Sequence, residues 1–260
     1  MLGVVHRYDT VSEFLDSFNR EAYDGTYSWM GNMDATEALA CAVYGHNDAV
    51  GEAEKVITRL ESSLQMPETA AWETVRSPFI GRVDIADWCA GSPTPMRRRV
   101  KRIKDTAPIK IVVDTFVSQG VDSDVLKRRG AAIVALVMLV QRFKPVDLFA
   151  CSSSTHTERE GYRHFVIRLE SRPVSLSQIG FVLGHPAFSR SLSNGFFTVM
   201  NPKAPSVPCL RLSREEIRAN LGLTARDIYI DRALYSDPMV SDTDAWIRNQ
   251  LDLIIRDANG

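Results

Sequence analysis

The chain has 260 residues, of which 45% are hydrophobic and 24% are charged, and its formal net charge is -1. These values exclude a disordered or fibrous chain, and the balanced charge excludes the global basic field that marks many nucleic-acid-binding proteins. The longest apolar stretch, residues 130–140, is shorter than the about 20 residues that cross a bilayer, and no signal peptide is recognisable, so we expect a soluble protein without a membrane partner.

The N-terminal part of the chain has the periodicity of helices. Residues 7–22 carry apolar side chains at helical spacing and predict a short amphipathic helix. A second helix is expected over residues 35–44, where Asp34 and Glu37 form a capping box, and a third over residues 47–64. We expect the second and third helices to pack together as a helical hairpin that precedes the main domain.

The next segment, residues 66–96, is irregular and is interrupted by four prolines. Within it, residues 82–88 alternate like a strand or a short edge element. We therefore expect two parts: an N-terminal helical and irregular region at residues 1–96, which packs on the core, and an α/β core domain at residues 97–260.

A dense basic run begins at the proposed boundary. Six of the eight residues from 97 to 104 are basic: Arg97, Arg98, Arg99, Lys101, Arg102 and Lys104. Such a run can neutralise phosphates, and arginine suits bidentate contacts with them, which predicts a phosphate or nucleic-acid site. The alternative is a solvated segment that leads into the first core strand and has its charge balanced by nearby acids.

An α/β core is predicted from residue 108 onward. An apolar strand, a long apolar helix and a second apolar strand, at residues 109–113, 125–143 and 146–151, follow one another in the order of a βαβ unit. Lys127, Arg128 and Arg129 are expected on the outer face of that helix. Further strands are predicted at residues 164–169, 196–200 and 227–231, and helices at residues 175–183, 187–192, 213–222 and 245–255. The pattern indicates an α/β fold, with a mostly parallel sheet and helices on both faces.

The end of the first core strand carries an incomplete metal-binding pattern. Asp114 and Ser118 match the outer positions of an Asp-x-Ser-x-Ser sequence, and Phe116, which offers no oxygen, stands at the middle position. The pattern resembles the divalent-cation site of the von Willebrand factor A fold, so the core is either of that kind or a generic doubly wound sheet. The hydroxyl of Ser152, at the next strand end, is a further candidate ligand. No cofactor is expected beyond Mg²⁺ at this position.

Nucleophilic chemistry has one candidate in this region. A thiolate at Cys151 can be activated by His156, but buried cysteine is the more common state, so we interpret Cys151 as a packing residue. No nucleophile elbow, phosphate-binding glycine-rich loop or pair of metal-binding cysteines or histidines occurs in the sequence. No motif therefore identifies a reaction.

Short matches between residues 25 and 150 form a second pattern. They are Trp29 to Gly31, Glu37 to Leu39, Ala42, Gly45, Val56, Val83 and Asp84, Gly91 to Pro93, Met96, Pro108 to Val113, Ser118, Arg129 to Ile133, and Val146 and Asp147. This pattern is similar to a family of uncharacterised tailed-bacteriophage proteins. The resemblance implies a phage origin and a place in the host cytoplasm or the virion, and it assigns no residue a role.

Taken together, these features favour a phage-encoded, non-enzymatic binding or assembly protein. Its α/β core would display loops to a protein partner or to further copies of the chain. The alternative is a nucleic-acid-binding protein that uses the basic run at residues 97–104. A third hypothesis is a metal-dependent enzyme centred on Asp114.

Overall fold

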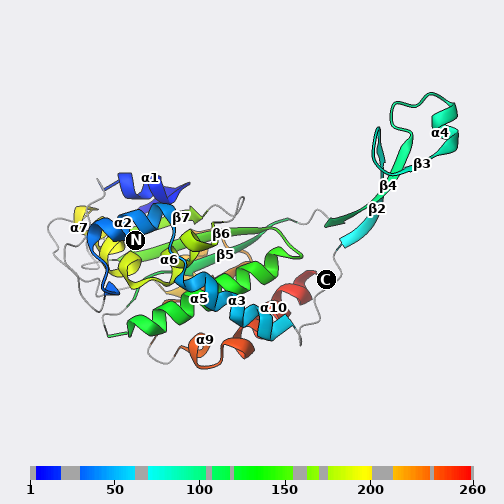
Figure 1. Cartoon of the computed structure of the whole chain (residues 1–260). Coiled ribbons are helices and arrows are strands. Elements are labelled where there is room, and N and C mark those ends of the chain that lie inside the picture. Colours follow the sequence, from blue (N-terminus) through cyan, green and yellow to red (C-terminus); the bar gives the residue numbers. More distant parts are fainter. Residues whose placement is uncertain are drawn as a thin grey trace.

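The computed structural model describes residues 4–18, 30–61, 70–103, 107–117, 120–154, 163–169, 175–200, 213–234 and 237–258. These residues form an α/β body built on a five-stranded sheet and a separate three-stranded arm that projects from the body (Figure 1). None of the described helices combines the length and apolar character that a bilayer-crossing helix needs.

The sheet of the body has the strand order β1-β7-β6-β5-β8. Its strands are β1 (Val4–Tyr8), β5 (Ile109–Asp114), β6 (Val146–Ser154), β7 (Arg163–Leu169) and β8 (Ile228–Ile230). Neighbouring strands run parallel, except that β6 and β7 are antiparallel. The predicted α/β class with a mostly parallel sheet is therefore confirmed, whereas the likeness to the von Willebrand factor A fold is not.

Helices cover both faces of this sheet. The larger layer contains α1 (Val11–Asp16), α2 (Ala35–Tyr44), α3 (Asp48–Glu61), α5 (Ser123–Gln141), α6 (Leu176–Gly184), α7 (Ser193–Met200), α9 (Pro238–Ser241) and α10 (Thr243–Ala258), together with the π-helical turn η2 (Phe188–Leu192). The opposite face is covered by α8 (Arg214–Asn220), whose Ile217 packs against Val112, Cys151 and Tyr229. We call these the α5 face and the α8 face.

Helix α5 lies at the centre of the helical layer and is buried on nearly all sides, as its continuous apolar sequence predicts. It packs against α3, α6 and α10. It crosses α6 where two glycines meet: a Cβ added at Gly130 would lie 2.4 Å from the Cα of Gly184. Glycine at both positions is what allows this close approach of α5 and α6.

The N-terminal helices belong to this same body. The bounds of α2 agree with the prediction, α3 lies within its predicted range, and α1 begins later and ends earlier than the helix expected at residues 7–22. The Asp34 side chain caps α2 by accepting from the Glu37 backbone N–H at 2.7 Å. However, α3 packs against α5 and α6, and α2 packs against α6 and η2, so the predicted hairpin pairing of α2 with α3 is not confirmed. Strand β1, where we had expected helix from residue 7, pairs with β7 at the sheet edge.

The predicted strand at residues 196–200 is wrong, because these residues end helix α7. The run of aromatic and β-branched residues there favours a strand locally. In the fold, the ring of Phe196 lies 5.4 Å from the ring of Phe14 and 5.3 Å from that of Phe165, measured between centroids. Packing of one helical face into this aromatic cluster overrides the local preference.

The arm is a small antiparallel sheet with the strand order β2-β4-β3. Its elements are β2 (Ala70–Ser77), β3 (Arg82–Val83), α4 (Ile85–Cys89) and β4 (Met96–Ile103). Ala70 pairs with Ile103 at one end of the arm, and Ser77 pairs with Met96 near the tip. The division expected at residue 96 therefore falls inside the arm, at the start of β4, and does not separate two bodies.

Candidate binding arm and polar sheet edge

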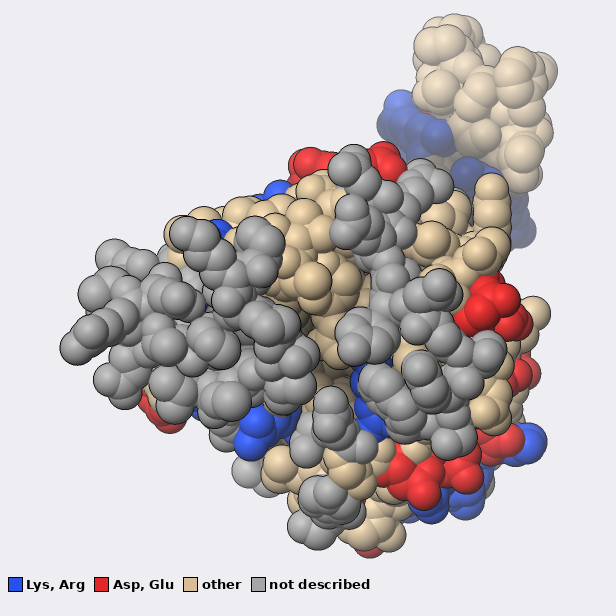
Figure 2. Space-filling model, turned by 90° about the vertical axis from the view of Figure 1, so that its left-hand side faces the viewer, with Lys and Arg blue, Asp and Glu red and all other residues tan. Residues whose placement is uncertain are grey.

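The basic run forms most of strand β4 of the arm, so it is extended. Arg97, Arg98 and Arg99 are exposed, Lys101 and Arg102 continue the strand, and Lys104 lies outside the described residues. Residues 70–103 contain seven Lys or Arg and three Asp or Glu, a formal charge of +4, against -1 for the whole chain. In Figure 2 the shaft of the arm is accordingly blue, and its tip is tan.

Three arginines stand side by side across the arm. Arg97 on β4 is the register partner of Arg76 on β2 and of Arg82 on β3. Like charges directly opposite one another destabilise a sheet, so this arginine row needs counter-charges. Two are supplied at the start of α4: Asp84 lies 2.6 Å from Arg97, and Asp87 lies 3.3 Å from Arg76.

The acids at the start of α4 compensate only part of the arginine row. Hydrogen bonds from the backbone of Asp87 and the nearby charge of Arg97 hold the pKa of Asp84 below its ordinary value, so it is an anion at neutral pH. Within the described part of the chain, neither Arg82 nor Arg98 forms an ion pair with an acidic side chain. The expectation that nearby acids balance the basic run therefore holds for Arg97, and positive charge remains around it.

The tip of the arm exposes large apolar side chains. Phe79 is 84% exposed, Ile85 is 75% exposed and Trp88 is 61% exposed, and Ile80 and Val83 are exposed beside them. The turn that carries Phe79 and Ile80 depends on a glycine, because Gly81 has a φ of 137° and a Cβ there would lie 2.5 Å from the Arg97 carbonyl oxygen. Among the described side chains of the arm, none belongs to a buried hydrophobic cluster.

The second candidate site lies where strands β5 and β8 end. Asp114 is buried on the α8 face, where its Oδ1 accepts from the Phe116 backbone N–H at 2.8 Å and its Oδ2 accepts from the Tyr229 hydroxyl at 3.2 Å. Burial raises the pKa of Asp114 to about 6, against the opposing effect of these hydrogen bonds. The same burial, with the neighbouring Asp114 charge, raises the pKa of Tyr229. The carboxylate is therefore held by the protein's own donors.

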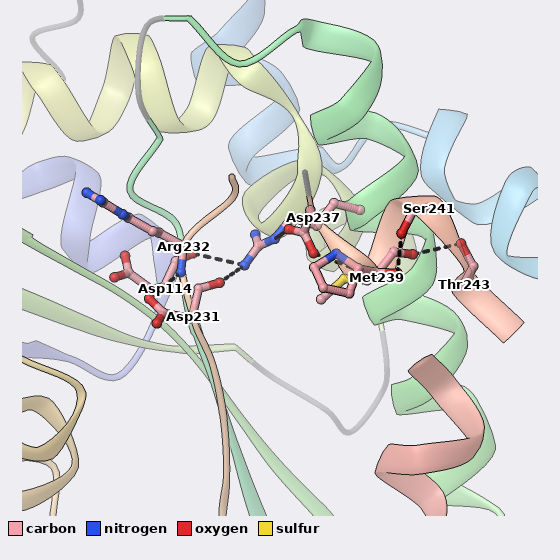
Figure 3. A network of polar contacts seen from close by, with 9 residues as sticks. Asp114, Asp231, Arg232, Asp237, Met239, Ser241 and Thr243 are labelled. Atoms are coloured by element: carbon pink, nitrogen blue, oxygen red, sulfur yellow. Dashed lines mark hydrogen bonds and ion pairs between the residues drawn. The ribbon is translucent and has the colours of Figure 1, made fainter. Parts of the chain in front are cut away.

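A buried arginine connects this sheet end to the following helix. Arg129 of α5 is 1% exposed and donates to the carbonyl oxygens of Asp231 and, at 3.4 Å, Asp114. Its Nε lies 3.4 Å from Oδ2 of Asp237, whose Oδ1 accepts from the Met239 N–H and caps α9. Figure 3 shows Asp114, Asp231 and Asp237 around this network. The expectation that Arg129 lies on the outer face of its helix is wrong.

Two residues of the predicted metal site, Asp114 and Ser152, are both among the residues that line the pocket beside α8. By the alternation of β6, the Ser152 side chain leaves the α5 face with Leu148 and Ala150, whereas the Asp114 side chain lies on the α8 face with Cys151. Ser118 lies outside the described residues. Over the described ranges, no group of three or more His, Cys, Asp or Glu side chains is arranged to hold a metal ion. A Mg²⁺ site at Asp114 remains a prediction.

A small pocket lies between the sheet and α8. It is lined by Asp114, Cys151, His164, Ile217 and Leu221, among others. Burial raises the pKa of the Cys151 thiol well above its ordinary value and lowers the pKa of His164 to about 4, so both groups are neutral at pH 7. Cys151 is thus a packing residue, with a buried and neutral thiol.

The fold and the two sites define an α/β protein with a projecting, basic β arm and an apolar tip. The family model described as "Domain of unknown function (DUF7192)" matches residues 3–257, and the chain belongs to this family. The matched range runs through the arm as well as the body. No curated protein matches, and no solved structure matches.

The exposure of the apolar side chains at the tip was not predicted from the sequence. One signal was present: Phe79, Ile80, Ile85 and Trp88 lie between prolines 78 and 93, in a segment with no helical periodicity that would give them a buried face. Large apolar residues without such a pattern have no predicted place in a core. That combination indicates exposed apolar side chains.

Proposed function

We propose that this protein is a non-enzymatic binding protein that engages a macromolecular partner through the arm, residues 70–103. The observation that carries the proposal is the exposure of Phe79, Ile85 and Trp88 at the end of an element that projects from the body (Figure 1). Soluble proteins rarely expose contiguous large apolar patches unless these serve as contact surfaces.

The composition of the arm supports this proposal. Tryptophan and arginine are the residue types most enriched among those that dominate binding energy at protein interfaces, and the arm places Trp88 close to the arginine row. A small sheet without its own core is only marginally stable, because little apolar surface is buried to offset the lost chain entropy. A partner that covers the tip would supply that burial.

The polar sheet edge supports a scaffold role for the body. The Tyr229 hydroxyl on β8 donates to the Asp114 carboxylate on β5. Arg129 donates to the Asp114 carbonyl oxygen and forms an ion pair with Asp237 at the start of α9, so these contacts connect β5, β8 and α9. The carboxylate, the hydroxyl and the guanidinium at this sheet edge are therefore engaged in contacts within the protein. The proposal therefore assigns recognition to the arm and rigidity to the body.

One observation favours nucleic acid as an alternative partner. The arginine row and the neighbouring Arg98 place several guanidinium groups on a narrow, exposed strand, and such groups suit phosphates. As for the setting of either function, the resemblance to tailed-phage proteins leaves the host cytoplasm or the virion as the expectation.

Site-specific photo-crosslinking in cells that naturally contain the protein tests the proposal. A benzophenone amino acid replaces Phe79 at the tip in one variant and Leu253 on helix α10 in a control, because both are exposed apolar positions. We expect a discrete crosslinked macromolecule from position 79 and none from position 253. Equal crosslinking from both positions, or none from position 79, would contradict a binding role for the arm.

A further inference from the structure

We infer that the arm binds a protein segment that combines apolar side chains with carboxylates, and this inference rests on the proposed function. It names the chemistry of the partner: an apolar anchor that covers the tip, flanked by Asp or Glu that pair with the arginines beside it. The tip supplies the apolar half of this match, and the charge of +4 on residues 70–103 supplies the other half.

The apolar side chains of the tip favour a protein over nucleic acid. Single-stranded nucleic acid is bound by stacking of bases on aromatic or guanidinium planes. Of the five exposed apolar residues at the tip, Ile80, Val83 and Ile85 are aliphatic and have no such plane. Aliphatic groups around a tryptophan are instead the composition of the apolar centre of a protein interface, and arginines are enriched around such centres.

The charges near the tip are also unsuited to a continuous phosphate backbone. Asp84 and Asp87 lie within the arginine row, so phosphates that tracked along the row would meet two carboxylates at its centre. A protein segment carries its negative charges at separate positions, and these can be placed at Arg82 and Arg98. Such pairing leaves the existing contacts of Arg76 and Arg97 intact.

The arm presents its remaining positive charge on both sides of the strand. Arg82 belongs to the arginine row and lies on the same face of the arm as Arg97. Arg98 follows Arg97 along β4, so the Arg98 side chain leaves the opposite face. An acidic segment that covers the tip can therefore reach a guanidinium on either face. Both arginines are exposed, and each is available for the bidentate contact that a carboxylate makes with guanidinium.

Selection of a random twelve-residue peptide library on the full-length protein tests this chemistry without assuming a named partner. Counter-selection uses a tip variant, Ile85→Ser combined with Trp88→Ser, in which two exposed side chains lose their apolar surface. We expect the enriched peptides to contain an aromatic or aliphatic anchor next to two or more Asp or Glu residues. Peptides that are basic, or that bind the tip variant equally well, would overturn the inference.

Fluorescence anisotropy with the most enriched peptide then separates the two halves of the match. We expect binding at least tenfold weaker to the tip variant and to the rim variant, Arg82→Glu combined with Arg98→Glu. A matched control, Tyr44→Ser combined with Leu253→Ser, removes exposed apolar groups from the body and should bind as wild type does. Circular dichroism of every variant must match wild type, and unchanged binding in either arm variant would overturn the inference.

Two further measurements give competing partners a clear outcome. A 20-nucleotide oligo(dT) and a 20-base-pair duplex are titrated across a salt series. Steeply salt-dependent binding that the rim variant loses, without any peptide binding, would overturn the inference in favour of nucleic acid and leave the proposed function standing. Sedimentation velocity tests whether the tip binds a second copy of the chain. A dimer that the tip variant does not form, and that prevents peptide binding, would also overturn the inference. Failure of the crosslinking at position 79 as well would remove the proposed function itself.

Discussion

Two arginines in this protein have opposite surroundings, and the comparison separates structure from recognition. Arg129 in the body is buried, and carbonyl oxygens and the carboxylate of Asp237 surround it. Arg97 in the arm is exposed, pairs with acids of its own arm and stands between two further arginines. Buried charge that is paired with a carboxylate and with carbonyl oxygens stabilises the fold, whereas charge gathered on a surface beside unburied apolar groups favours binding.

The largest effect on stability is expected from Arg129→Met. Methionine keeps much of the side-chain length, but it leaves the Asp237 carboxylate without its ion-pair partner and the carbonyl oxygens of Asp114 and Asp231 without the guanidinium that donates to them. Breaking a buried ion pair from one side costs about 3–5 kcal/mol, and urea unfolding followed by circular dichroism measures this loss. Arg128→Met, at the exposed neighbour, should change the free energy of unfolding by less than about 0.5 kcal/mol.

A double variant sharpens this first prediction. Arg129→Met combined with Asp237→Asn removes both charges of the pair, so its cost should be clearly less than the sum of the two single costs. Strict additivity would show that the two side chains do not interact, and the interpretation of the sheet edge as a structural network would fail.

The next largest effect is a pH dependence that belongs to Asp114. Its pKa in the folded protein is about 6 and its ordinary value is 3.8, so between these pH values the folded state binds more protons than the unfolded state. Its contribution to stability is therefore present below about pH 4 and lost as the pH rises through 6, by roughly 3 kcal/mol. Asn cannot ionise, so the stability of Asp114→Asn relative to wild type should increase over this interval.

Unfolding by urea at pH 4.5 and at pH 8 measures this relative stability. Burial lowers the pKa of His164 and His185 to about 4 in the folded protein, which acts in the opposite direction, because the unfolded state then binds more protons between pH 4 and 6.5. Both histidines are present in wild type and in the variant, so their contribution cancels in the comparison. A difference that is flat with pH would mean that Asp114 has an ordinary pKa.

A smaller effect is expected at the crossing of α5 and α6. Gly130→Ala places a Cβ against the Cα of Gly184, so the helices must separate, at a cost of about 1–3 kcal/mol. Gly51→Ala, on the exposed side of α3, meets no atom within 4 Å and should stabilise the protein by about 0.5–1 kcal/mol, since alanine favours the helix. Thermal unfolding of the pair checks both signs, and a loss of stability in both variants would contradict the close packing described for Gly130.

The smallest effect on the body is expected from shortening the arm. Ser77 and Met96 are register partners, so residues 78–95 can be replaced by an Asn-Gly turn that closes a two-stranded hairpin. Because the removed residues contribute nothing to the hydrophobic clusters of the body, its free energy of unfolding should change by less than about 0.5 kcal/mol. A larger loss of stability would show that the arm stabilises the body, and would contradict the assignment of recognition to the arm and rigidity to the body.

Much of the body could be predicted because its signals are local and repeated. The apolar run at residues 109–113, the long apolar helix at residues 125–143 and the helix predicted at residues 213–222 each correspond to an element of the structure. Strand β1 was missed because Val4–Tyr8 is short and half polar, and its pairing partner β7 lies about 160 residues away in sequence. Such long-range pairing leaves no periodic signal in the strand itself.

The sites were harder to predict, for two different physical reasons. Arg129 follows Lys127 and Arg128 in sequence and looks like part of a solvated face, and only the positions of Asp237 and the ends of β5 and β8 explain its burial. At the tip, the lack of helical periodicity around Ile85 and Trp88 indicates that they have no buried face, but it does not place them on a projecting arm, because that depends on the pairing of β2 with β4. The basic run, by contrast, was recognised from composition alone, while the arginine row depends on a register that no composition reveals.

The pairing of Ala70 with Ile103 brings the two ends of the arm side by side. None of the described arm side chains belongs to a hydrophobic cluster of the body. The arm is therefore an insertion with adjacent ends, and a segment of this kind can be exchanged for another while the buried contacts of the body keep their residues.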